Sequence, residues 1–196
     1  MLFQILKDML SLLYQTLGFS VLFAFVAMFF FIYAKECGGY KVAIKKWAVL
    51  FKSDAKFRYL FVFVIYIMIL LHRTLFNRDM WSNPLSNIIG IWSLVDGDGN
   101  FTAEIPENIL LFMPFGFLIF LIRSYEECKK VKSIALYAVK FSFMFSIGIE
   151  CCQLFLRLGT FQLSDLFFNT LGGLLGGLIY WIFHMIHTRD KQIDCS

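Results

Sequence analysis

The sequence predicts an all-α integral membrane protein, a five-transmembrane-helix bundle with its N-terminus outside and its C-terminus cytoplasmic. Composition is the first reason, because 59% of the 196 residues are hydrophobic and 16% are charged, whereas a soluble domain is about 45–50% apolar and about 25% charged. The mean hydropathy of +0.71 agrees with this class. The second reason is that Lys and Arg cluster in alternate connecting segments. This composition excludes a disordered or fibrous protein and argues against a soluble globular enzyme.

Five apolar segments are long enough to cross about 30 Å of hydrocarbon as a helix, which takes about 20 residues. They are residues 9–34, 57–76, 106–122, 133–156 and 166–187. The first contains no charged residue and is too long for the hydrophobic region of a signal peptide. We therefore expect it to be retained as a spanning helix.

Basic residues in the connecting segments set the predicted orientation. Segments 35–58 and 123–132 carry seven and four Lys and Arg residues, whereas segments 72–105 and 157–165 carry two and one. Because cytoplasmic loops are enriched in Lys and Arg, the first two segments are predicted to be cytoplasmic and the other two external.

The chain is expected to divide into residues 1–56, a first transmembrane helix followed by a basic interfacial segment, and residues 57–196, a four-helix transmembrane core. Segment 40–56 is predicted to be an amphipathic helix lying on anionic headgroups. Its lysines and its apolar residues fall on different faces: Lys41, Lys45, Lys52 and Lys56 on one, and Ile44, Trp47, Ala48 and Phe51 on another. The segment is interpreted as a topology anchor, with lipid binding or docking as the alternative.

Polar residues gather at the predicted outer ends of four spans, where each requires a reason because ionisable groups inside a membrane are costly. The candidates are Arg73, Glu107, Asn108, Glu150, Gln153, Arg157, Asp165 and Asn169. Glu150 lies about 9 Å inside its predicted helix end and requires a cation or hydrogen-bond donors, which Arg73 or Arg157 would supply.

Helical spacing predicts that several of these residues share a face. Glu150, Gln153 and Arg157 are three and seven residues apart, and Asp165 and Asn169 are four apart. The connection between the fourth and fifth spans is short, so these helices are predicted to be antiparallel neighbours. Asp165 and Asn169 are therefore expected to face Glu150 and Gln153.

Two interpretations of this polar group stay open. In one, its members form interhelical hydrogen bonds and helix caps, with Ser164 or Asp165 capping the fifth span. In the other, they line an outward-facing cleft that binds or processes a component of the outer leaflet.

Small residues predict close packing in the third and fifth spans. The stretch 171–178 reads LGGLLGGL and holds two glycine pairs spaced four apart, Gly172/Gly176 and Gly173/Gly177. Such pairs let a neighbouring backbone approach, and we expect that contact within the molecule rather than in a dimer. Pro114 with Gly116 predicts a kink in the third span.

The sequence shows no motif of the common soluble enzymes and no pattern typical of a metal site. The sequence contains no H-E-x-x-H, P-loop, G-x-S-x-G or dinucleotide motif, and its His and Cys spacing predicts no metal site. We expect no cofactor and no nucleic-acid partner. Segment 96–107 copies part of a calcium-loop spacing, but Phe101 replaces the turn glycine, so an acidic turn is expected and calcium binding is the alternative.

Three stretches resemble motifs of VanZ-like membrane proteins. Residues 108–117 (NILLFMPFGF) resemble N-x-x-x-F-x-P-F-G, residues 146–157 (SIGIECCQLFLR) resemble S-x-x-x-E-x-x-Q-x-x-x-x-R, and residues 164–173 resemble D-x-x-x-N-T-x-G-G. The resemblance covers residues 60–185. Its motif residues are Asn108, Pro114, Gly116, Glu150, Gln153, Arg157, Asp165, Asn169, Thr170 and Gly172.

The resemblance implies a class rather than a reaction. It implies a multi-pass protein of the bacterial cytoplasmic membrane that lowers susceptibility to teicoplanin-type glycopeptide antibiotics, and it transfers no catalytic role. The expected function is to bind or shield a cell-envelope component, with membrane lipids and a lipid-linked cell-wall precursor or glycopeptide as partners. One alternative is a membrane-embedded enzyme acting on a lipid-linked or phospholipid headgroup, with Glu150 and Asp165 as an acid–base pair. The other is a structural or partner-binding membrane protein.

Overall fold

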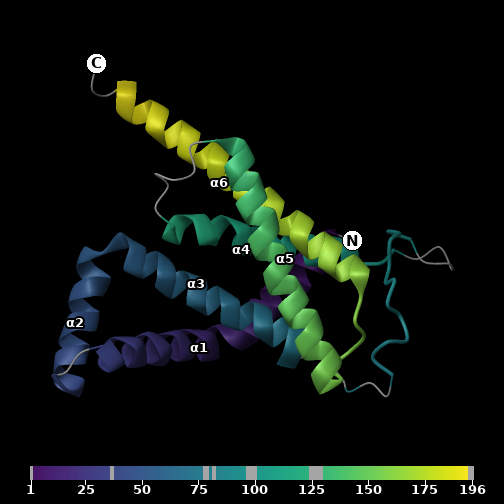
Figure 1. Cartoon of the computed structure of the whole chain (residues 1–196), viewed down its shortest axis with the longest axis horizontal. Helices are drawn as coiled ribbons and strands as arrows, with labels where there is room; N and C mark the ends of the chain where they lie inside the picture. The colour runs from purple at the N-terminus through teal and green to yellow at the C-terminus, as the bar shows by residue number, and fades with distance from the viewer. Residues whose placement is uncertain are drawn as a thin grey trace. The chain divides into compact units, whose positions relative to one another are not determined.

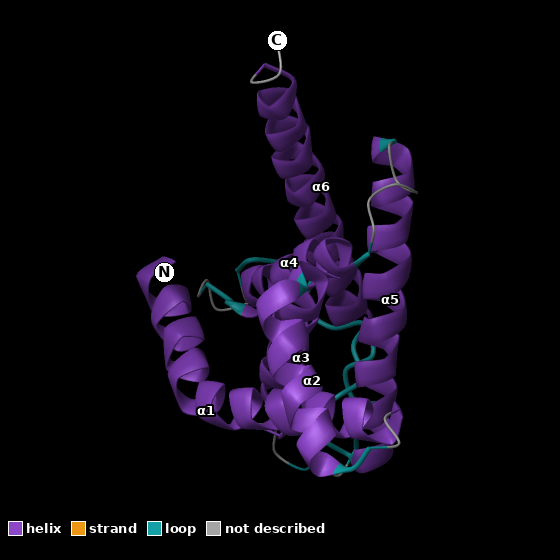
Figure 2. Ribbon diagram, turned by 90° about the vertical axis from the view of Figure 1, so that its left-hand side faces the viewer, coloured by secondary structure: helices purple, strands orange, loops and turns teal. Residues whose placement is uncertain are grey.

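The computed structural model describes residues 2–35, 38–76, 80, 83–95, 101–123 and 130–193. The regular structure in this part of the chain is helical (Figures 1 and 2). In chain order it comprises α1 (Leu2–Lys35), α2 (Tyr40–Ser53), α3 (Ala55–Leu71), the π-helix η1 (His72–Phe76), α4 (Glu104–Ile122), α5 (Val131–Leu156) and α6 (Leu163–Ile193).

Within the described residues, five helical stretches are long and apolar enough to cross a membrane, which confirms the predicted all-helical class with five spans. They are Tyr14–Lys35, Ala55–Phe76, Glu104–Ile122, Val131–Leu156 and Leu163–Ile186.

The last three spans begin earlier than the sequence predicted, at Glu104, Val131 and Leu163 rather than at 106, 133 and 166. Hydropathy misses the first turns of α4 and α6 because they contain acidic residues, which suit the positive end of a helix. As a result, Ser164 and Asp165 lie inside the first turn of α6 instead of at a capping position before it.

The chain forms two compact units, residues 2–76 and residues 77–196, which we describe separately. The division between these units falls after Phe76, because α3 packs along α1. The domain division after residue 56 stays a prediction.

In the N-terminal unit, α1 and α3 run antiparallel and α2 connects them (Figure 1). A stripe of buried side chains recurs at every fourth position of α1: Thr16, Ser20, Ala24, Met28 and Ile32. Residues four apart lie on one face of a helix, and small residues on such a face permit close approach between membrane helices.

Aromatic rings attach α2 to its neighbours. The Trp47 ring stacks on Phe51 of the same helix with centroids 5.0 Å apart, and it also contacts Phe25 of α1 at 4.8 Å and Phe57 of α3 at 6.1 Å. Ala43 is the fully buried residue of this face, whereas Ile44 is 52% exposed. The packed face of α2 therefore includes Ala43 rather than Ile44, and so differs from the face predicted from sequence. The difference arises because the rings of Trp47 and Phe51 pack towards α1 and α3.

The turn between α2 and α3 is fixed at both ends. The Arg58 guanidinium donates to the carbonyl oxygens of Phe51 and Lys52, each at 3.0 Å, which satisfies the C-terminal end of α2. Asp54 precedes α3 and accepts a hydrogen bond from the Lys56 backbone N–H at 2.8 Å.

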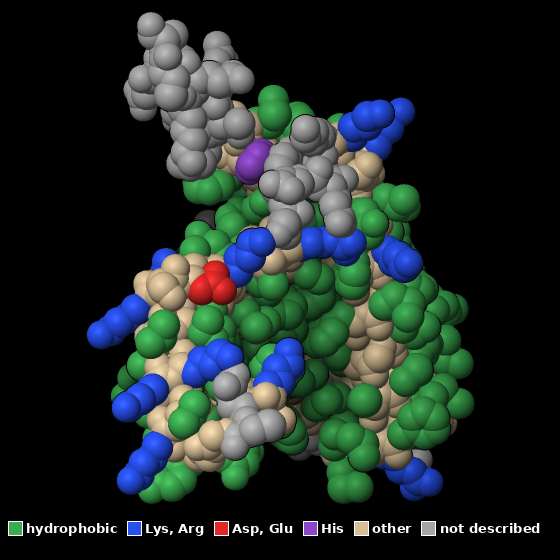
Figure 3. Space-filling view, turned by 60° about the vertical axis from the view of Figure 1, so that its left-hand side comes forward, with side chains coloured by type: hydrophobic (Ala, Val, Ile, Leu, Met, Phe, Trp, Pro, Cys, Tyr) green, Lys and Arg blue, Asp and Glu red, His purple; other side chains and the backbone are tan. Residues whose placement is uncertain are grey.

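Lysine side chains point to solvent along α2. The exposed ones are Lys41, Lys45, Lys46 and Lys52. Figure 3 shows basic side chains projecting from this unit beside an extensive hydrophobic surface. This arrangement suits a helix at the boundary between apolar chains and anionic headgroups.

In the C-terminal unit, α6 packs along both α4 and α5. Phe120, Ile134, Ala138 and Tyr180 form a buried cluster from all three helices. Nearer the other end, the Phe115 ring of α4 stacks on Phe145 of α5 with centroids 4.9 Å apart.

The first glycine pair of α6 faces the backbone of α4. A Cβ added at Gly172 or Gly176 would collide with carbonyl oxygens of that helix, those of Ile109 and Met113 respectively. This is the close backbone approach that the spacing predicted, and it lies within the molecule.

The second pair, Gly173 and Gly177, departs from that expectation because side chains of α5, not its backbone, approach most closely. A Cβ at Gly173 would collide with the Ser142 hydroxyl. A Cβ at Gly177 would lie 2.8 Å from the Ala138 Cβ of α5 and 3.2 Å from the Phe120 ring of α4. Gly177 therefore packs on the buried cluster between two helices, and spacing alone could not distinguish this contact from a backbone one.

Helix α4 is continuous through Pro114. Two residues further on, a Cβ at Gly116 would meet the backbone carbonyl of Gly173. Helices α4 and α6 therefore also approach each other closely where two glycines meet.

Candidate functional site

Buried polar residues lie where α4 begins, α5 ends and α6 begins. Six of them are less than 5% exposed: Ser142, Ser146, Glu150 and Gln153 of α5, and Ser164 and Asn169 of α6. Buried polar groups are stable only when hydrogen-bonded, so their partners define what this end of the unit does.

One stripe of α5 supplies most of the group. Ser142, Ser146, Glu150 and Gln153 follow at intervals of four, four and three residues, so they share one face of the helix. That face turns towards α6, which explains why all four are buried in an otherwise apolar helix.

Glu150 lies at the N-terminus of α6. Its Oε2 accepts a hydrogen bond of 2.9 Å from the backbone N–H of Gln162, the residue immediately before Leu163, where α6 begins. Helix N-termini carry unsatisfied N–H donors and a partial positive charge. This donor and this charge stabilise a carboxylate that is only 1% exposed.

Asp165 and Asn169 join α6 to both of its neighbours. Asn108 Nδ2 of α4 donates to Asp165 Oδ1 at 2.8 Å, and Asn169 Nδ2 donates to the Ser146 hydroxyl of α5 at 2.9 Å. These are interhelical hydrogen bonds, the arrangement of the first interpretation.

Arg157 ends α5 in the left-handed conformation, with φ 56° and ψ 39°. The backbone N–H of Leu158 then donates to the Gln153 carbonyl at 2.9 Å, which closes the helix. The Arg157 side chain is exposed, outside the buried group.

The two remaining polar candidates lie at helix ends. Glu107 is half-buried in the first turn of α4, one residue before Asn108, where its charge suits the helix dipole. Arg73 is half-buried in η1 of the N-terminal unit. Single π-turns recur at functional sites.

The glycines predicted to pack α6 surround the polar group without belonging to it. Gly173 is the one that reaches it, through its contact with the Ser142 hydroxyl. Gly177 lies one turn further along α6, against Ala138 in the apolar cluster, and so takes no part in the polar site.

A connecting loop, residues 83–95, is held against the start of α6. The backbone N–H groups of Phe161 and Leu163 donate to the carbonyls of Pro84 and Ile88, at 2.9 and 2.8 Å. The Ile91 N–H donates to the Ser164 hydroxyl at 3.1 Å. We call these residues the docked loop.

Gly90 makes this docking possible. Its φ of 75° lies in the left-handed region that favours glycine, and an added Cβ would collide with the Ser164 hydroxyl.

The docked loop exposes apolar side chains while its backbone is anchored. Leu85, Ile88, Ile89, Trp92, Leu94 and Val95 are between 42% and 70% exposed. The Trp92 ring also packs against Phe167 and Phe168 of α6, with centroids 5.4 and 5.6 Å apart. A rigid loop that presents Trp and aliphatic side chains suits the boundary between water and acyl chains.

Among the buried polar atoms of this group, Asn169 Oδ1 and Ser142 Oγ accept or donate no hydrogen bond within the part of the chain that the structure describes. Among the described residues there is also no group of three His, Cys, Asp or Glu side chains placed to hold a metal ion. Residues 96–100 of the calcium-loop interpretation lie outside the described residues.

The candidate residues chosen from sequence did not include Ser142, Ser146 or Gln162. Ser142 and Ser146 were recognisable from their spacing of four ahead of Glu150, and Ser146 begins one of the family-like motifs. Gln162 carried no signal, because its backbone N–H, not its side chain, holds Glu150. The docking of the loop carried no signal either, since its contacts join residues more than 70 positions apart; residues 83–87 only loosely resemble an outer-loop segment of VanZ-like proteins.

These features define a class: a multi-pass membrane protein whose last three helices are joined at one end by buried polar side chains. The chain belongs to the VanZ/LLP1 family, which it matches over residues 19–184. This confirms the resemblance seen in the three motifs and extends it into the first span, where no motif is found.

A known relative is Protein VanZ of Enterococcus faecium, which is 29% identical to this chain over 96 residues. Those residues make up 49% of this chain and 54% of the relative, so the chain spans about half the length of that protein. No solved structure matches this chain.

Proposed function

We propose that this protein resides in the bacterial cytoplasmic membrane and lowers susceptibility to teicoplanin-type glycopeptide antibiotics by binding or shielding a cell-envelope component at the outer leaflet. The observation that carries the proposal is the docked loop, whose apolar side chains are exposed while its backbone is anchored to α6. A lipid-linked cell-wall precursor offers an apolar chain for such a surface.

In this proposal the buried polar residues position the loop and are not a cleft that contacts the ligand. Glu150 and Asp165 are both engaged in hydrogen bonds, with Gln162 N–H and with Asn108. The same bonds favour positioning over an acid–base pair, because a catalytic carboxylate must reach its substrate.

The test compares two apolar truncations of equal exposure. Ile89 of the docked loop and Leu136 of α5 are each 70% exposed. In cells expressing the protein, Ile89→Ala should return teicoplanin susceptibility towards that of cells lacking the protein, whereas Leu136→Ala should leave protection intact. Membrane abundance of each variant is measured by immunoblot.

Three results would overturn the proposal or part of it. If expression of the unmodified protein left teicoplanin susceptibility unchanged, the proposed role in antibiotic protection would be wrong. Full protection by abundant Ile89→Ala and Leu85→Ala proteins would remove the loop as the binding surface. Turnover of a lipid pyrophosphate that is lost in a folded Glu150→Gln protein would replace binding by the enzyme alternative.

A further inference from the structure

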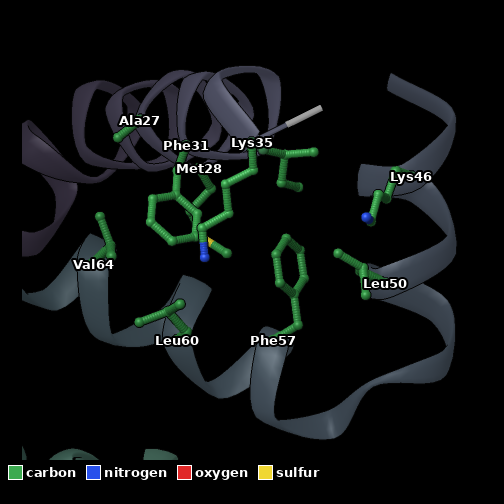
Figure 4. Close-up of a pocket in the computed structure, with 10 residues that line it drawn as sticks. Ala27, Met28, Phe31, Lys35, Lys46, Leu50, Phe57, Leu60 and Val64 are labelled. Atoms are coloured by element: carbon green, nitrogen blue, oxygen red, sulfur yellow. The ribbon is translucent and has the colours of Figure 1, made fainter. Parts of the chain in front are cut away.

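A half-open cavity of about 460 Å³ lies between the helices of the N-terminal unit (Figure 4). All three helices of the unit line it: Ala27, Met28, Phe31, Ile32 and Lys35 from α1, Lys46 and Leu50 from α2, and Phe57, Leu60 and Val64 from α3. Its volume is within the range of small-molecule sites, about 300–1,000 Å³.

The lining is apolar except for two lysines. Eight of the ten lining residues are hydrophobic, and the other two are Lys35 and Lys46. The Lys35 ammonium lies 4.4 Å from the centroid of the Phe31 ring, and Figure 4 shows its side chain turned into the cavity. An apolar lining that includes two cations matches a ligand with an apolar chain and an anionic head.

The cavity is half-open to its surroundings, so a molecule outside the unit can enter it. A bilayer offers acyl chains to fill an apolar cavity. The occupant most available to this unit is therefore a membrane lipid.

The positive charge of α2 favours anionic lipids over neutral ones. Residues 37–53 contain no Asp or Glu, and Lys41, Lys45, Lys46 and Lys52 are exposed along the helix. Basic residues beside a membrane favour anionic lipids. Lys35 and Lys46 line the cavity, so these two lysines can bind the headgroup of a single lipid. The other lysines can only attract the membrane surface as a whole.

We propose that this cavity holds one acyl chain of an anionic glycerophospholipid, with Lys35 and Lys46 as the cations that attract the lipid phosphate. The site lies within residues 2–76, on helices that take no part in the docked loop. It is independent of the proposed function, and its test does not measure antibiotic susceptibility.

The experiment is native mass spectrometry of the full chain released from detergent micelles. Added probes are phosphatidylglycerol, phosphatidylcholine with the same acyl chains, and glycerol phosphate. We expect retention of one phosphatidylglycerol molecule, weaker retention of phosphatidylcholine, and none of glycerol phosphate. Equal retention of phosphatidylglycerol and phosphatidylcholine would show that the lysines do not select an anionic headgroup.

A charge variant and its matched control separate a site from general attraction. Lys35→Gln with Lys46→Gln should weaken phosphatidylglycerol binding by about 25-fold, at about fivefold for each Lys. Lys41→Gln with Lys45→Gln removes two exposed charges of α2 that do not line the cavity and should change binding by less than about threefold. Equal losses in both variants would overturn the proposal.

A filling variant tests the cavity itself. Val64 lines it, whereas Val62 on the same helix is 47% exposed and does not. Val64→Trp should abolish retention of phosphatidylglycerol, and Val62→Trp should preserve it. If Val64→Trp fails to fold, Leu60→Phe replaces it. Retained binding in a folded filling variant would contradict an acyl chain in this cavity.

Discussion

Four glycines of α6 determine how closely α4 and α5 can approach it. Apolar burial gives little preference for one helix contact over another inside a bilayer, so membrane helices associate through packing and interhelical hydrogen bonds. At Gly172 and Gly176 the neighbouring atoms are backbone carbonyl oxygens of α4, whereas at Gly173 and Gly177 they are side-chain atoms. Backbone cannot move aside as a flexible side chain can, so the first two positions tolerate enlargement least.

Gly176→Ala should destabilise the C-terminal unit, because the new methyl would collide with the Met113 carbonyl. Overpacking of this kind costs about 1–3 kcal/mol. Gly148→Ala is the matched control, since a Cβ there meets nothing within 4 Å and alanine gains up to about 1 kcal/mol in a helix. Thermal unfolding in detergent, followed by circular dichroism, should give a lower midpoint for Gly176→Ala alone. Equal midpoints would mean that α6 does not pack at this distance.

Residue-level prediction from sequence succeeds where a side chain acts at a helical interval. The spacing of four within each glycine pair predicts close packing. It does not predict which helix each pair contacts. Gly90 and Gln162 carry no such signal. Gly90 acts through a φ of 75° in a loop, and Gln162 acts through its backbone N–H. Backbone roles of this kind become visible only when the fold is known.

The first turn of α6 is the element that links the spanning helices to the docked loop. Its Leu163 N–H and Ser164 hydroxyl bond to Ile88 and Ile91, and the preceding Gln162 N–H bonds to Glu150. Orphan donors at a helix N-terminus are thus satisfied by a carboxylate and by a loop. This one short segment therefore positions both the C-terminal end of α5 and the docked loop.

Ser164→Ala should loosen the docked loop without unfolding α6. The substitution removes the acceptor of the Ile91 N–H, and one hydrogen bond contributes about 1 kcal/mol, which corresponds to about fivefold faster amide exchange. Hydrogen–deuterium exchange of peptides covering residues 83–95 measures the change. Ser53→Ala removes a serine hydroxyl bond to the Val49 carbonyl in the other unit, and it should leave exchange in the loop unchanged. Unaltered exchange in Ser164→Ala would show that this bond does not anchor the loop.

Elements are predictable from sequence to the extent that length and hydropathy define them. The five spans follow from apolar runs of about 20 residues, and all five are found. The polar first turns of α4 and α6 were missed because acidic residues lower hydropathy yet stabilise helix N-termini. The π-turn of η1 was also missed, since one additional residue per turn leaves no periodic pattern.

At the scale of the whole molecule, the polar group and the basic segments occupy opposite ends of the C-terminal unit. The hydrogen bonds of Asn108, Asp165 and Glu150 place the start of α4, the end of α5 and the start of α6 together. Arg123 and Lys130 flank the other end of α4 and the start of α5. The positive-inside rule therefore predicts that the docked loop faces outside.

Reporter fusions test this orientation. A periplasmic-type reporter joined within residues 77–100 should be active, and a cytoplasmic reporter should be active when joined within residues 124–131, because the second segment is the basic one. Joining each reporter at the other site supplies the control. Cytoplasmic activity within residues 77–100 would place the docked loop inside the cell, where it cannot meet an external antibiotic. The proposed function would then fail, whereas the acyl-chain site of the N-terminal unit would be moved to the outer leaflet and its lipid selectivity would still be measurable.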